Sequence, residues 1–231
     1  MSVVASSQAV IFTQWNFNSV PADALTSTGS ILPSTGAGTA SLVGTTATFA
    51  SGGTIITPGS TDPALTDNTA WNTSGYQAAT VGSGTRGVQF LVSTAGQQNI
   101  IIKWDQRHSN TSSKFSQFQY TVDGTNFITT GLTGGGVFTA SAGDTWFNNR
   151  TVDLSTISGV NNNVNFGFRV VAIFAPSTSA YAASTVTSTY GTTGTNRFDM
   201  VTVDSEPVPE PATMIALLAG ATAMLARRKK A

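Results

Sequence analysis

A single histidine, His108, is the residue best suited to acid–base chemistry, and it lies in the segment 104–109, WDQRHS. Asp105 could orient the imidazole, and one of the many serines could be the nucleophile that it activates. No Gly-x-Ser-x-Gly nucleophile elbow accompanies this segment in the sequence. The pattern therefore favours a surface or loop-end histidine over a catalytic one.

Paired carboxylates could support glycoside hydrolysis, which is the second enzymatic chemistry to consider. The two glutamates, Glu206 and Glu210, both lie near the C-terminal end, so a hydrolase would need a pair of aspartates. Asp123 is expected in a hairpin turn, and Asp62 and Asp67 in a loop beside a proline. We expect a protein without catalytic activity, with an aspartate-dependent hydrolase as an alternative.

Metal and thiol chemistry is limited by composition. The chain has no cysteine and one histidine, which excludes a disulfide framework, a thiol nucleophile and a metal site built from several histidines. Oxygen ligands for a structural calcium ion are available. Asn16, Asn18 and Asp199 would converge if the first and last predicted strands pair, and we expect no other cofactor.

Three aromatic residues in polar segments are candidates for stacking on the sugar rings of a glycan. Trp71 and Tyr76 lie in the segment 68–76, and Trp146 is surrounded by aspartate, threonine and asparagine. Packing in the core or anchoring of a loop is the competing interpretation of each ring.

Charge excludes one class of partner. Of 231 residues only 10% are charged, against about 25% in an ordinary soluble domain. Residues 1–210 carry 7 basic and 11 acidic groups, and the other 4 basic residues lie in the segment 227–230. A mildly acidic body whose basic residues are scattered singly has no footprint for nucleic acid.

The segment 10–205 has the period-two pattern of β-strands. Val88, Phe90 and Val92 alternate with other residues, and apolar residues alternate in the same way from Val164 to Phe174. Asp-Gly, Gly-Gly-Gly and Asn-Asn-Asn punctuation separates the runs. The sequence predicts one antiparallel β-sandwich over 10–205, with a jelly-roll-like order preferred to an immunoglobulin-like one.

Residues 206–231 have a different character. Pro207, Pro209 and Pro211 predict a stiff extended spacer. The following 15 residues, 212–226, are uncharged and as a helix would span about 22 Å, which is short for a hydrocarbon core of about 30 Å. The basic tail Arg227, Arg228, Lys229 and Lys230 would stay on the cytoplasmic side, so the body would lie outside.

This order of short motif, marginal span and basic tail closely resembles the PEP-CTERM sorting domain. Pro209, Glu210 and Pro211 match its motif residue by residue. The resemblance implies recognition and cleavage near the motif by an exosortase, a membrane peptidase, in bacteria that make exopolysaccharide. It also implies a signal peptide, and residues 1–9 read as the remnant of one because Ser7 and Ala9 fit the small-residue cleavage rule.

These observations predict an exported, non-enzymatic surface or extracellular-matrix protein. Its short helix would hold it briefly in the membrane before an exosortase cuts it, and the body would then lie on the cell surface or outside the cell. A carbohydrate-binding module acting on exopolysaccharide is the alternative, with Trp71, Tyr76 and Trp146 as its contacts.

Overall fold

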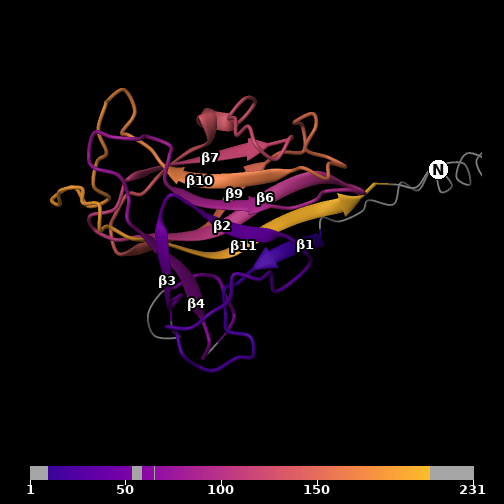
Figure 1. Ribbon diagram of the computed structural model, residues 1–231, viewed down its shortest axis with the longest axis horizontal. Helices are drawn as coiled ribbons and strands as arrows, with labels where there is room; N and C mark the ends of the chain where they lie inside the picture. Colours follow the sequence, from indigo (N-terminus) through magenta and orange to yellow (C-terminus); the bar gives the residue numbers. More distant parts are fainter. Residues whose placement is uncertain (1–9, 54–58, 65, 209–231) are drawn as a thin grey trace, which may run out of the picture.

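The computed structural model describes residues 10–53, 59–64 and 66–208. Over these ranges the chain forms two sheets of strands (Figure 1). Within each sheet, every pair of neighbouring strands is antiparallel. The predicted all-β sandwich is therefore confirmed.

The six-stranded sheet has the order β3-β4-β11-β6-β9, with β1 also pairing with β11. Its strands are β1 (Val10–Trp15), β3 (Thr46–Ser51), β4 (Thr69–Ser74), β6 (Gln97–His108), β9 (Thr145–Asp153) and β11 (Asn196–Pro207). The five-stranded sheet has the order β2-β5-β10-β7-β8. Its strands are β2 (Thr39–Val43), β5 (Gly87–Leu91), β7 (Phe115–Thr121), β8 (Val137–Thr139) and β10 (Gly167–Ala172).

Successive strands switch repeatedly from one sheet to the other, with β3–β4 and β7–β8 staying in the same sheet. This alternation is the crossing pattern of a jelly-roll-like sandwich. Within the described ranges, the helical content is one short 3-10 turn, η1 (Thr133–Gly136), and no helix there is long and apolar enough to cross a bilayer. The helix predicted over 212–226 lies outside the described residues.

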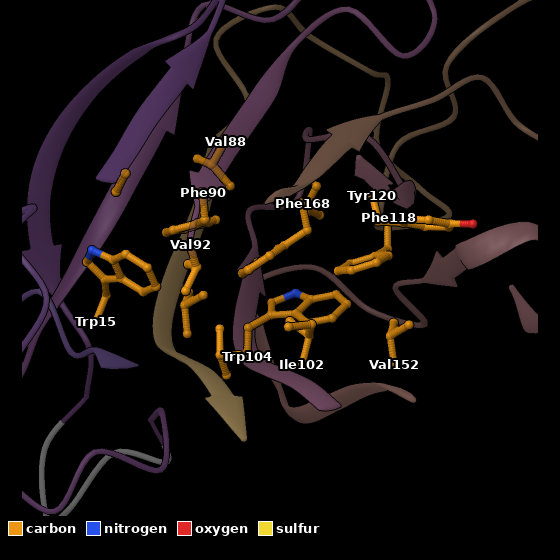
Figure 2. Close-up of a cluster of buried hydrophobic side chains, with 14 of the residues drawn as sticks. Trp15, Val88, Phe90, Val92, Ile102, Trp104, Phe118, Tyr120, Val152 and Phe168 are labelled. Atoms are coloured by element: carbon orange, nitrogen blue, oxygen red, sulfur yellow. The ribbon is translucent and has the colours of Figure 1, made fainter. Parts of the chain in front are cut away.

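The core is a row of stacked aromatic rings between the sheets. Phe168 of β10 stacks on Phe90 of β5 at 5.1 Å and on Phe118 of β7 at 5.6 Å between ring centroids. Trp104 of β6 reaches across from the other sheet and stacks on Phe118 at 5.8 Å. Figure 2 shows Phe168 between these two phenylalanines, with Trp104 facing them.

The alternation read from the sequence explains most of this core. Val88, Phe90 and Val92 are buried, as is the run from Phe166 through Val170 on alternate residues. Val164 departs from the prediction because it is 68% exposed. The chain at Val164 is still in a turn. The side-chain amide of Asn163 stabilises this turn by donating hydrogen bonds to the carbonyls of Val122 and Gly159.

We predict that Phe168→Ala lowers the free energy of unfolding by about 3–5 kcal/mol, because it removes a ring that stacks on two others in a closed core. Val164→Ala is the matched control, and it should cost less than about 0.5 kcal/mol at its exposed position. Urea titration of both variants measures the difference. Equal losses would contradict the central role of the aromatic row.

Candidate functional site

The end of β11 connects the folded body to the Pro-Glu-Pro segment. Pro207 is the register partner of Gln97 on β6, so β11 continues two residues past the predicted boundary of the body. The amide of Val208 then donates a 2.8 Å hydrogen bond to the carbonyl of Gly96. Pro209, Glu210, Pro211 and the basic tail 227–230 lie outside the described residues, and in the sequence the first three follow directly on this bonded end.

Side chains reinforce the same end of β11. The hydroxyl of Ser205 donates to Oε1 of Gln97 at 2.7 Å, and the amide of Asn99 donates to the carboxylate of Glu206 at 3.0 Å. On the other side of the strand, Val10 pairs with Ser205, so β1 begins where β11 ends. Sequence reasoning missed these contacts, because it assigned Pro207 to a free spacer.

Two of the three predicted glycan contacts are corrected by their burial. Trp71 is 4% exposed and stacks on Phe17 at 5.5 Å. Tyr76 is 5% exposed, its hydroxyl lies 2.6 Å from that of Thr73, and burial raises its pKa to about 12. Both rings face the interior because they belong to or adjoin β4, whose inward positions close the sandwich. They have no free face for a sugar.

Trp146 has a different environment. It lies on β9 opposite Arg107 of β6, where it is half-buried. Its neighbour Phe147 points the other way and meets the ring of His108 edge-on at 5.6 Å. Trp146 therefore lies on the outer face of the six-stranded sheet, and its proposed contact with a glycan stays a prediction.

His108 is an interior residue, not the surface histidine that the sequence favoured. Its Nδ1 lies 3.0 Å from the carbonyl oxygen of Ser113, and its Nε2 lies 3.4 Å from a guanidinium nitrogen of Arg150. Burial, and then the charge of Arg150, lower its pKa to about 3. The imidazole is consequently neutral at ordinary pH.

Asp105 does not orient this histidine. The two residues are three apart on a strand, so their side chains point to opposite faces of the sheet. The Asp105 carboxylate accepts hydrogen bonds from the backbone N–H and the hydroxyl of Thr61 and from the backbone N–H of Asn149. The arrangement needed for a serine–histidine–aspartate triad is absent at this pair.

The predicted calcium ligands take part in separate hydrogen bonds. β1 and β11 do pair, as the prediction required. However, the side-chain amide of Asn18 donates to the Asp62 carboxylate at 2.7 Å, and the side-chain oxygen of Asn16 accepts from the backbone N–H of Asn18 at 3.3 Å. The Asp199 carboxylate accepts from the hydroxyl of Ser60. In the part of the chain that the structure describes, no three acidic or imidazole side chains converge closely enough to hold a metal ion.

Asp199 is the most unusual carboxylate of the body. It is fully buried, and burial raises its pKa well above the usual value of 3.8, with a smaller contribution from Asp62 and Asp105. The hydroxyl of Ser60 and the amide of Met200 partly offset this shift. The segment 59–64 thus covers a pair of outward aspartates, Asp105 and Asp199, which lie opposite each other on β6 and β11.

We predict that Asp199→Asn raises the melting temperature at pH 8. A carboxyl whose pKa is raised by folding binds its proton more tightly in the folded state, so its contribution to stability is lost as pH rises above the unfolded value. Asparagine removes the charge and keeps one of the two hydrogen bonds that Asp199 accepts from Ser60 and Met200, and the gain should shrink toward pH 4. Differential scanning calorimetry at both values measures this. A melting temperature of Asp199→Asn below that of the wild type at pH 8, together with a rise in the wild-type melting temperature on addition of calcium, would instead indicate a cation held by Asp199.

Comparisons with known proteins identify the C-terminal segment. The family model described as the PEP-CTERM protein-sorting motif matches residues 207–230. No curated protein matches the chain. Among solved structures, the K1 cleaved adhesin domain of Lys-gingipain from Porphyromonas gingivalis W83 has 11% identity and a TM-score of 0.37, covering 74% of this chain and 91% of that one.

A second solved structure is the CBM22-1-CBM22-2 tandem domain of Xyn10C from Paenibacillus barcinonensis. It has 7% identity and a TM-score of 0.41, and the alignment covers 91% of this chain and 50% of that one. The sequence match at the C-terminal end is the informative one, since such a motif implies export and handling by an exosortase. Residues 207–230 of this chain are a PEP-CTERM protein-sorting motif, and the body that carries it is an all-β sandwich.

Proposed function

We propose that this protein is a non-enzymatic component of the cell surface or extracellular matrix, which an exosortase releases from the membrane by cutting near Pro209-Glu210-Pro211. The apolar segment 212–226 holds the chain in the membrane until then, and Arg227–Lys230 stays on the cytoplasmic side. The observation that carries the proposal is the sorting motif, which begins at the last residue of β11.

The body supports a non-catalytic role. Its one histidine is buried and neutral, and the aspartate nearest to it in sequence on the same strand points to the other face. A surface with few charges and many serines and threonines suits a hydrated polysaccharide matrix. We therefore include association with exopolysaccharide in the proposed role.

Processing is the direct test. In the native host, the protein recovered from the surface or the medium should end close to Pro209. Replacement of Pro209, Glu210 and Pro211 by alanine should leave a full-length chain in the membrane fraction, because the peptidase no longer recognises it. Pro176→Ala, in an exposed loop of the body, is the control and should be processed normally. Intact-mass spectrometry distinguishes the forms. Normal processing of the triple-alanine variant would contradict the proposal.

The bonded end of β11 also predicts the rate of processing. Residues 209–211 span only about 10 Å when extended, between a strand held to β6 and the apolar segment. A peptidase needs exposed, unpaired backbone, so cleavage should depend on local opening of this end. Insertion of six Gly/Ser residues after Val208 should speed release several-fold in a pulse-chase experiment.

The same insertion between Gly134 and Gly135, in the exposed turn η1, controls for the added length. Equal release rates for the two insertions would show that β11 does not limit cleavage. If the wild type and both insertion variants all stay unreleased, the result would instead count against sorting itself.

A further inference from the structure

Five polar or aromatic side chains form one straight row across the outer face of the six-stranded sheet. Consecutive register pairs join Thr48 to Asn72, Asn72 to Arg197, Arg197 to Arg107, and Arg107 to Trp146. Residues directly opposite each other on neighbouring strands point to the same face. The row therefore crosses β3, β4, β11, β6 and β9 in order, over roughly 19 Å at the spacing of strands in a sheet.

Burial of the flanking residues fixes the direction of the row. Trp71, Phe198, Gln106 and His108, which lie beside row members on their strands, are all buried in the interior. The row members themselves are only partly covered or exposed. The row therefore faces outward, away from the five-stranded sheet.

The charges in this row are poorly explained by stability. Arg197 and Arg107 are directly opposite each other, and like charges in that position destabilise a sheet. Arg107 forms an ion pair with Asp144 at 2.9 Å. Burial, and then the charge of Arg107, lower the pKa of Arg197, so the second guanidinium increases the local positive potential.

Apart from Asp144, the aspartates close to the row accept hydrogen bonds from other parts of the chain. Asp105 and Asp199 lie two residues from Arg107 and Arg197 on the same strands and face, but their oxygens accept hydrogen bonds from Thr61 and Ser60 of the covering segment 59–64. In the described ranges, neither of these two carboxylates forms an ion pair with Arg107 or Arg197.

Two buried polar atoms in the row also lack partners. Arg197 donates from one terminal nitrogen to the carbonyl of Ser51 at 2.7 Å, but its Nε has no hydrogen-bond partner in the described structure. Asn72 donates to the hydroxyl of Thr48 at 3.1 Å, while its Oδ1 is similarly unpaired. Such atoms are rare in native proteins. Both are covered from solvent, so they mark an imperfectly paired sheet face and not themselves a ligand position.

We infer that this row binds an extended anionic polysaccharide whose sugar rings carry carboxylate or sulfate groups. The guanidinium groups of Arg107 and Arg197 match the planar geometry of a carboxylate. Trp146 offers a large rigid ring for a sugar face, and Asn72 and Thr48 offer amide and hydroxyl groups for sugar hydroxyls. A row across five strands suits a chain of sugars laid over the sheet.

This inference gives a ligand class to the matrix association proposed above, and it rests on that part of the proposed function. A single-stranded nucleic acid would also meet arginines and an aromatic ring. It is disfavoured because the row contains one aromatic ring, whereas the stacking of successive bases needs several.

The test measures binding of the full-length protein, kept in a mild non-ionic detergent, to immobilised polygalacturonate. Dextran is the neutral comparison, and an oligo-dT strand is the nucleic-acid comparison. Polygalacturonate should bind at low salt and weaken as salt is added, and the other two should bind at least tenfold more weakly. Arg107→Gln, Arg197→Gln and Trp146→Ala should each reduce polygalacturonate affinity about tenfold or more.

Arg169→Gln is the matched control, because it removes the same charge from β10 on the opposite sheet. There the Arg169 guanidinium donates a hydrogen bond to the side-chain oxygen of Gln119 on β7. This variant should leave the affinity unchanged. Thermal melting confirms that each variant is folded. If Arg197→Gln does not fold, Arg107→Glu takes its place, because the side chain of Arg107 is partly exposed in its ion pair with the half-exposed Asp144.

The inference is overturned if polygalacturonate does not bind at low salt, if Arg107→Gln binds as well as Arg169→Gln, or if dextran or oligo-dT binds as tightly as polygalacturonate. The assay requires neither export nor cleavage. A failure here therefore counts against the row alone, whereas a chain that stays full-length in the host counts against the proposed sorting and leaves the binding result standing.

Discussion

The pairing of β11 with β6 is the interaction on which the rest of the structure depends. Both are 12-residue strands, and their ladder runs from Asn196 opposite His108 to Pro207 opposite Gln97. The other edge of β11 is shared by β4 near its start and β1 near its end. One strand therefore joins the first strand, the edge hairpin β3–β4 and the centre of the sheet.

This pairing also links the fold to its proposed use. Near the start of β11, the alternation of side chains on β11 and β6 sends Phe198 and Trp104 into the core and Arg197 and Arg107 outward. At its end, the same ladder holds the chain until the residue before Pro209. The outer row and the point at which the ladder ends before the sorting motif both depend on one strand register, and a one-residue slip would move both.

The sequence was sufficient for the fold class and for the sorting motif, because both are encoded locally. Period-two alternation around Phe90 and Phe168 predicts half-buried strands without any knowledge of their partners. The sorting motif Pro209-Glu210-Pro211 is contiguous in the sequence. What could not be predicted depends on distant partners. Trp71 lies in a polar segment, yet the pairing of β4 with β11 directs its ring onto Phe17.

The candidate surface illustrates the same limit. Trp146 was singled out from its polar neighbours, but Arg107 and Arg197 resemble isolated solubilising charges in the sequence, 90 positions apart. Only the strand order brings them face to face. The covering of Asp105 and Asp199 by residues 59–64 is likewise a tertiary contact with no local signal beyond the turn residues of that segment.

Hydrogen–deuterium exchange on the purified full-length protein tests the central role of β11 most directly. We predict that the backbone amides of β11 bonded to β6 exchange slowly together, and that the amide of Val208 is protected as well. Exchange of residues 204–208 as fast as that of unprotected backbone, beside a slowly exchanging first half of β11, would contradict this prediction. In that case, the sorting motif would follow a free linker and not the end of a strand.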